Sequence, residues 1–67
     1  MKFGDAIRYY RILVGLSQEN VARDLGISRQ TYCNYENGKR SPSLDILVRI
    51  AEILDVDVDT LLRNKIQ

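Results

Sequence analysis

Histidine and tryptophan are missing from this sequence of 67 residues, and cysteine and proline each occur once. Without histidine, and with Cys33 as the only thiol, the chain lacks the clustered nitrogen and sulfur ligands of a zinc site, so we expect no metal and no cofactor. A single cysteine cannot form a disulfide within the chain either. A chain this short and without such crosslinks must be stabilised by well-packed helices or by a partner chain.

Long apolar segments are also absent. The longest uninterrupted aliphatic runs, at 12–14 and 46–48, are three residues each, whereas a membrane-spanning helix needs about 20. We therefore expect no membrane association, no signal peptide and a cytoplasmic protein. The sequence offers no histidine, no glycine-rich phosphate loop and no nucleophile with a base, so we expect no enzyme.

Neither sign of charge is in clear excess, because ten Lys and Arg residues oppose nine Asp and Glu residues, for a net charge of +1. The distribution is uneven. Residues 29–40 contain three bases and one acid, a net charge of +2, whereas residues 45–59 contain five acids and one base, a net charge of −4. A net charge near zero can therefore conceal a basic face of the kind that nucleic acids bind.

Apolar residues recur at the spacing of an α-helix, and no segment shows the alternation of a β-strand. Serine, glycine and aspartate residues suited to helix ends divide the chain into five expected helices. These helices cover residues 3–14, 18–25, 29 to about 37, 44–54 and a short segment after Asp57. We expect residues 64–67 to fray. The sequence therefore predicts an all-α fold, one compact five-helix domain that covers residues 1–67.

The third expected helix has two chemically different sides. At about 100° per residue, Gln30, Asn34 and Asn37 lie on one side, and Tyr32 and Tyr35 lie on the other. We expect the tyrosines to anchor this helix to the core. The polar side then faces solvent and can hold a ligand.

The helix before it completes a recognisable unit. Ala22 is small enough for two helices to cross closely, and Gly26 permits a sharp turn between them. With the two tyrosines that follow, this spacing is typical of a helix-turn-helix, which we expect to cover about 17–37.

The sequence resembles the Cro/C1-type helix-turn-helix transcriptional regulators, also called lambda-repressor-like or XRE-family proteins. The resemblance extends from Phe3 to Leu62 and rests on LSQENVARDLGIS at 16–28, YENGKRSPS at 35–43 and LVRIAEILDVDVDTLL at 47–62. It implies a lambda-repressor-like fold. It also implies a sequence-specific transcriptional regulator, a repressor, that reads a palindromic operator in double-stranded DNA through the major groove.

The resemblance also implies roles for individual residues. Arg29, Gln30 and Asn34 match positions of the recognition helix that commonly read bases. The residues expected to contact DNA phosphates are Ser17, Gln18, Asn37, Lys39 and Arg40. Arg11 and Glu36 match an ion pair that ties the first helix to the end of the recognition helix.

We expect a homodimer, because a single recognition helix contacts too few base pairs to select one operator in a genome. A two-fold dimer reads two half-sites about one helical turn apart. In the family the last helices commonly form the dimer seam, and the corresponding apolar residues here are Val56, Val58, Leu61, Leu62 and Ile66. The sequence ends soon afterwards, so we expect no effector domain after the last helix.

Two features keep other hypotheses open. Tyr9, Ile12 and Val14 place apolar residues on the first helix at positions that the family frequently fills with charges, and these residues can form a protein-partner site. The chain would then be an antitoxin or an anti-repressor that binds a partner through the same fold.

Cys33 occupies a recognition-helix position that is more often polar, and a redox role there requires a lowered pKa that no neighbour clearly supplies.

Overall fold

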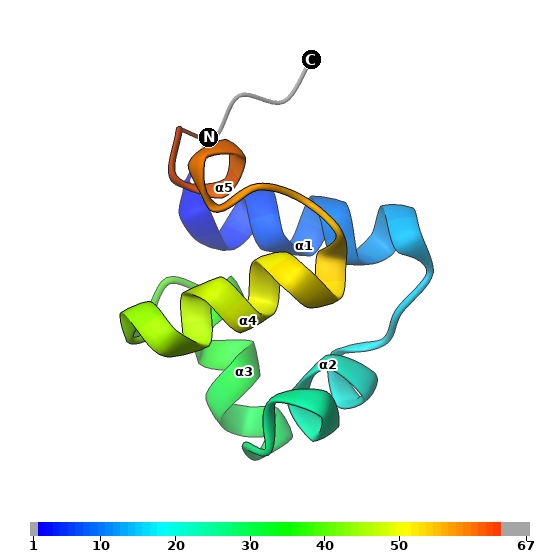
Figure 1. The fold of residues 1–67 in the computed structure, drawn as a ribbon. Helices are drawn as coiled ribbons and strands as arrows, with labels where there is room; N and C mark the ends of the chain where they lie inside the picture. Colours follow the sequence, from blue (N-terminus) through cyan, green and yellow to red (C-terminus); the bar gives the residue numbers. More distant parts are fainter. Residues whose placement is uncertain (1, 64–67) are drawn as a thin grey trace.

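The computed structural model describes residues 2–63, and every regular element in this range is a helix (Figure 1). The helices are α1 (Phe3–Val14), α2 (Gln18–Leu25), α3 (Arg29–Glu36), α4 (Leu44–Leu54) and α5 (Val58–Arg63). The predicted all-α fold with five helices is confirmed, and the helix bounds agree with the prediction to within a residue. The fraying predicted for 64–67 lies outside the described residues.

Capping side chains set the start of three helices. Ser17, Ser28 and Ser43 each accept a hydrogen bond from the backbone N–H three residues later, which satisfies a donor that the first turn leaves unpaired. Ser17 also forms a reciprocal capping box with Asn20. Gly26 ends α2 with a φ of 73°, and this left-handed conformation turns the chain directly into α3.

One apolar core joins the five helices. Its largest fully buried side chains are Tyr32, Ile7, Ile50, Leu54, Leu61 and Val21. In Figure 1 α4 crosses the middle of the molecule, with α1 and α5 above it and α2 and α3 below it. Tyr32 is fully buried and Tyr35 is 8% exposed, and their rings pack edge to face with centroids 6.4 Å apart. The prediction that this tyrosine pair anchors α3 to the core is confirmed.

A close backbone contact fixes the end of α3 against the start of α1. Gly4 is buried in the first turn of α1, and a Cβ atom there would overlap the carbonyl oxygens of Glu36 and Tyr35. Glycine alone lets the two backbones approach this closely. The sequence did not predict this contact, which holds the last turn of α3 against the first turn of α1.

Arg49 of α4 binds the C-terminal end of α2, beside the turn of the helix-turn-helix. Its guanidinium donates hydrogen bonds to the backbone carbonyls of Asp24 and Leu25. These carbonyls belong to the last turn of α2, where they have no partner within the helix and where a cation is favourable.

Within residues 2–63 no helix has the length and the apolar composition that crossing a bilayer requires.

Candidate nucleic-acid interface

The polar side of α3 is accessible from solvent. Arg29 and Gln30 are exposed and Asn34 is half-buried, while Tyr32 and Tyr35 occupy the core side of the same helix. Gln30 Nε2 donates a hydrogen bond to Asn34 Oδ1 at 3.1 Å, so the two amides are already aligned with each other. The structure thus brings Gln30 and Asn34 together, whereas Arg29 lies roughly 140° from Asn34 around the helix, and contact of all three with bases stays a prediction.

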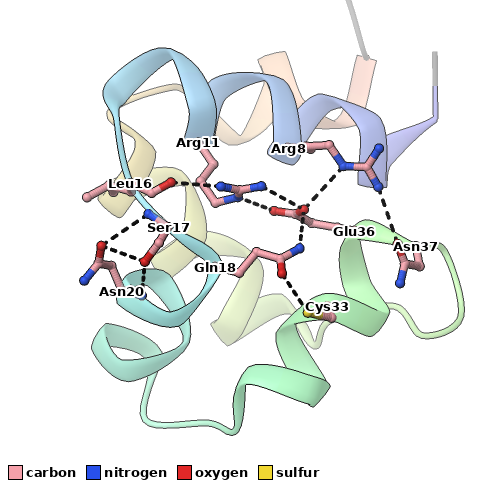
Figure 2. Close-up of polar contacts among 9 residues, drawn as sticks. All are labelled: Arg8, Arg11, Leu16, Ser17, Gln18, Asn20, Cys33, Glu36 and Asn37. Carbon is pink, nitrogen blue, oxygen red and sulfur yellow. Dashed lines mark hydrogen bonds and ion pairs between the residues drawn. The ribbon is translucent and has the colours of Figure 1, made fainter.

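The buried carboxylate of Glu36 lies at the C-terminal end of α3 (Figure 2). Glu36 is only 2% exposed, and Arg11 donates to it from Nε at 2.7 Å and from Nη2 at 3.3 Å. Gln18 Nε2 donates at 3.0 Å and Arg8 Nε at 3.4 Å. Side chains from α1 and α2 thus converge on one residue of α3. A buried charge with several donors holds its partners in place because separating them would leave the charge unpaired.

The network sets the protonation states of its members. Burial alone would raise the pKa of Glu36, but the hydrogen bond from Arg11, the adjacent Tyr32 hydroxyl and the hydrogen bond from Gln18 outweigh it, so this pKa lies below its ordinary value. The hydrogen bond to Glu36 raises the pKa of Arg11. Burial raises the pKa of Tyr32, whose hydroxyl lies beside the carboxylate but outside hydrogen-bonding geometry. At neutral pH the carboxylate and the guanidinium are therefore charged and the phenol is protonated.

Gln18, which the sequence predicts to grip phosphate, has both ends of its amide engaged inside the domain. Its Nε2 donates to Glu36, and its Oε1 accepts a hydrogen bond from Cys33 Sγ at 3.0 Å (Figure 2). A phosphate contact through this side chain would have to replace one of these bonds. The backbone N–H of Gln18 lies in the first turn of α2, where it has no partner within the helix.

The other predicted phosphate contacts lie on either side of α3. Ser17 is exposed at the start of α2, although its hydroxyl is engaged in the cap. Asn37, Lys39 and Arg40 are exposed in the loop after α3. Arg8 Nη2 donates to Asn37 Oδ1 at 3.4 Å, and this places a further cation beside the loop.

The sequence did not single out Arg8. A usable signal was present, because Arg8 precedes Arg11 by three residues, and side chains at that spacing in a helix lie near one another. Both arginines contact Glu36 in the structure.

A hollow lies beside the start of α2. It measures about 350 Å³ and is lined by Arg11, Ser17, Gln18, Glu19 and Arg29. The first turn of the helix and the Arg29 guanidinium favour an anion there, whereas Arg11 is already paired with Glu36 and the Glu19 carboxylate opposes an anion. Of the residues predicted to read bases, Arg29 is the one that lines this hollow.

The residues predicted for the dimer seam do not form one exposed surface. Leu61 is fully buried, so its assignment to an intermolecular seam is wrong: its side chain already packs in the core of the monomer. Val56 and Val58 are half-buried against that core. Leu62 is 57% exposed, and Ile66 lies outside the described residues.

Leu62 belongs to a different apolar surface from the one that the sequence predicted. It lines a hollow of about 220 Å³ together with Phe3, Pro42 and Leu47. Leu44, at the start of α4, is 71% exposed. Apolar side chains from α1, the α3–α4 loop, α4 and α5 thus meet on one side of the molecule.

Comparisons with known proteins give a consistent result. A helix-turn-helix family model, HTH_3, matches residues 7–61. The chain is 42% identical over 55 residues to the HTH-type transcriptional regulator MJ0272 of Methanocaldococcus jannaschii, a match that covers 82% of this chain and 83% of that protein. It is 35% identical over 62 residues to the cryptic phage CTXphi transcriptional repressor RstR of Vibrio cholerae, covering 92% of this chain but only 56% of RstR.

A solved structure extends the comparison to geometry. The fold is similar to that of SinR from Bacillus subtilis, a master regulator for biofilm formation that was crystallised in complex with DNA. The TM-score is 0.82 at 31% sequence identity, and the match covers 90% of this chain and 97% of that one.

Proposed function

This chain belongs to the helix-turn-helix family of transcriptional regulators, and we propose that it is a repressor that binds a specific operator sequence in double-stranded DNA. The observation that carries the proposal is the solvent-accessible polar surface of α3, to which the exposed Arg29 and Gln30 and the half-buried Asn34 belong. The similarity to RstR, which is a transcriptional repressor, and to the DNA-bound form of SinR supports it.

In this function α3 enters the major groove. The Gln30 and Asn34 amides match the donor and acceptor pattern of adenine, and the Arg29 guanidinium matches that of guanine. The hydrogen bond between Gln30 and Asn34 restricts both side chains before DNA is bound. This restriction reduces the conformational entropy that binding removes.

Phosphate contacts on either side of α3 fix its orientation in the groove. On one side lies the hollow at the start of α2, lined by Arg11, Ser17, Gln18, Glu19 and Arg29, where Arg29 and the first turn of the helix would meet a phosphate. On the other side lies the loop with Asn37, Lys39 and Arg40, to which we add Arg8 because it is bonded to Asn37. Glu36 faces inward, so its charge is paired with arginine and does not oppose the phosphates.

We propose that the repressor is a homodimer and that its seam lies on the apolar surface around Leu62. The exposed Leu62 lines the hollow together with Phe3, Pro42 and Leu47, and the exposed Leu44 belongs to the same helix as Leu47. Val56 and Val58 are half-buried and contribute at most an edge of the seam. A dimer of this kind acts by occupying its operator in the cytoplasm and excluding polymerase, and it makes or breaks no covalent bond.

Selection of bound duplexes from a random DNA pool tests this function. We expect the wild-type chain to enrich a palindrome with half-sites about one helical turn apart. The Gln30→Ala variant should enrich a related palindrome that has lost its preference at one position in each half-site. Absence of any enriched sequence, or an unchanged preference in the variant, contradicts the proposed reading face.

A further inference from the structure

The outer side of α1 exposes an apolar stripe. Tyr9, Ile12 and Leu13 recur at helical spacing, and they are 39%, 62% and 66% exposed. Val14, which the sequence grouped with Tyr9 and Ile12, is 45% exposed but lies roughly 140° from Tyr9 around the helix. The stripe therefore consists of Tyr9, Ile12 and Leu13, and contiguous exposed apolar side chains of this kind mark protein-interaction surfaces.

An acidic hollow borders the stripe. Tyr10 packs edge to face against Tyr9, with ring centroids 5.0 Å apart, and it also lines a hollow of about 410 Å³ at the α4–α5 turn. The other residues that line this hollow are Ala51, Glu52, Asp55, Val56, Asp57 and Thr60. The carboxylates of Glu52, Asp55 and Asp57 are exposed, and none forms an ion pair with a residue in the range 2–63. The tyrosine pair thus connects an apolar stripe to a hollow of uncompensated negative charge.

We propose that the stripe and the acidic hollow form one docking surface for a short amphipathic helix of a partner protein, apolar on one side and basic on the other. Its apolar side chains would pack on Ile12 and Leu13, and a Lys or Arg would enter the hollow beside Tyr10. Burial of the apolar side chains supplies the attraction, and the carboxylates select a basic partner over an acidic one.

This docking surface is separate from the proposed DNA interface. Arg8 and Arg11 of α1 are bonded to Glu36 on α3, whereas Tyr9 and Leu13 of the stripe lie roughly 100° and 140° from Arg8 around the helix. The proposal does not depend on DNA binding, because it uses none of the residues assigned to bases or phosphates. A bound partner helix would leave α3 accessible.

The charge of the hollow argues against two other occupants. A second copy docked through the same surface in a two-fold dimer would place the three carboxylates of each copy in one interface without a base from either hollow, and like charges repel. A nucleic acid would be repelled for the same reason. A basic segment is the partner whose charge complements the surface.

Selection from a random peptide library displayed on phage tests the proposal. The full chain is the target, and the Ile12→Ser/Leu13→Ser double variant is the counter-target that removes binders of other surfaces. We expect the enriched peptides to combine apolar residues at helical spacing with a net positive charge. Enrichment of acidic peptides, or no enrichment above the counter-target, overturns the proposal.

Titration calorimetry with one enriched peptide then separates the apolar from the electrostatic contribution. The triple variant Glu52→Gln/Asp55→Asn/Asp57→Asn should bind about tenfold more weakly, because it removes three exposed carboxylates that attract the basic side chain in the hollow. Asparagine tolerates the left-handed φ of 59° at position 55, so this variant keeps its fold. Unchanged affinity in the triple variant overturns the proposal.

Two controls complete the test. Val14→Ser replaces an apolar side chain of α1 that is 45% exposed and lies outside the stripe, and it should leave the peptide affinity unchanged; an equal loss in this variant means that the peptide binds elsewhere and overturns the proposal. Sedimentation of the Ile12→Ser/Leu13→Ser variant should show the oligomeric state of the wild type. A dimer that dissociates in this variant identifies a second copy as the occupant and overturns the proposal.

Discussion

The two sides of α1 differ in how far their side chains are already engaged. On the side that faces α3, Arg8 and Arg11 are bonded to the buried carboxylate of Glu36, whereas on the outer side Ile12 and Leu13 are mostly exposed to solvent. The side that faces α3 fixes the position of the recognition helix through these bonds. The outer side makes no comparable contact with the described part of the monomer. Substitutions on the first side should therefore change stability and DNA binding together, and substitutions on the second should change neither.

The largest effect is expected from Glu36→Ala. The substitution leaves Arg11, whose side chain is only 12% exposed, without its charge partner, and breaking a buried pair in this way costs about 3–5 kcal/mol. A domain of this size has a total stability of only about 3–10 kcal/mol, so much of the variant should be unfolded at room temperature. Urea denaturation followed by circular dichroism measures the loss.

Asp59→Ala is the matched control for that experiment. Asp59 also accepts a hydrogen bond from an arginine, Arg63, at 2.8 Å, but both side chains are largely exposed. An exposed pair contributes at most about 1 kcal/mol. Equal destabilisation by the two substitutions would show that burial of Glu36 has no special role.

Gly4→Ala tests the backbone contact between α1 and α3, with an expected loss of about 1–3 kcal/mol. Alanine is the better helix former by about 1 kcal/mol, so any destabilisation has to come from the overlap of the new Cβ with the carbonyl of Glu36. Thermal unfolding measures the change. Asp5→Ala, an exposed position in the same turn, should change stability by less than about 0.5 kcal/mol; stabilisation by Gly4→Ala would show that the backbones separate easily.

Gln30→Ala and Lys39→Ala should weaken operator binding in different ways. Loss of Gln30 should cost about 1–3 kcal/mol on the operator and little on other sequences, because it removes a base contact. Loss of Lys39 should weaken binding to all sequences alike and reduce the slope of log K against log salt by about one. Binding titrations with operator and random duplexes at several salt concentrations distinguish them, and identical behaviour of both variants would contradict the division between base and phosphate contacts.

Periodicity and capping residues predicted the features that depend on neighbouring residues, whereas the one distant contact that was predicted, the ion pair of Arg11 with Glu36, came from the resemblance to a known family. Serine caps and Gly26 set the helix boundaries, and the helical period placed Tyr32 and Tyr35 in the core. All of these follow from residues within one or two turns of each other, where the geometry of a helix fixes which side chains share a side.

The features that the sequence missed depend on contacts between distant segments. Gly4 meets a backbone 32 positions away, and Cys33 bonds to Gln18 across the turn between two helices. Leu61 and Leu62 are adjacent apolar residues in a short helix, and only the packing against α1 and α4 decides that Leu61 is buried and Leu62 exposed. A periodic pattern shows that α5 has an apolar side but does not determine which of its residues the monomer itself covers.

The smallest effect is expected at acidic pH, where protonation of Glu36 should weaken its stabilising contacts with Arg8 and Arg11 of α1. Because the pKa of Glu36 is lower in the folded chain than its ordinary value, its ionised form stabilises the fold at every pH above the unfolded pKa of about 4.3. This contribution falls as the pH decreases from there through the folded pKa. The free energy of unfolding of wild type should therefore exceed that of Glu36→Gln by a constant amount between pH 5 and pH 7, and by a smaller amount at pH 3. Urea denaturation of both proteins at these pH values measures the difference, and since every other carboxylate titrates in both, their contributions cancel. A difference that grows toward pH 3 would mean that the buried carboxylate is protonated more readily when folded, and that the arginines of α1 do not hold its charge in place.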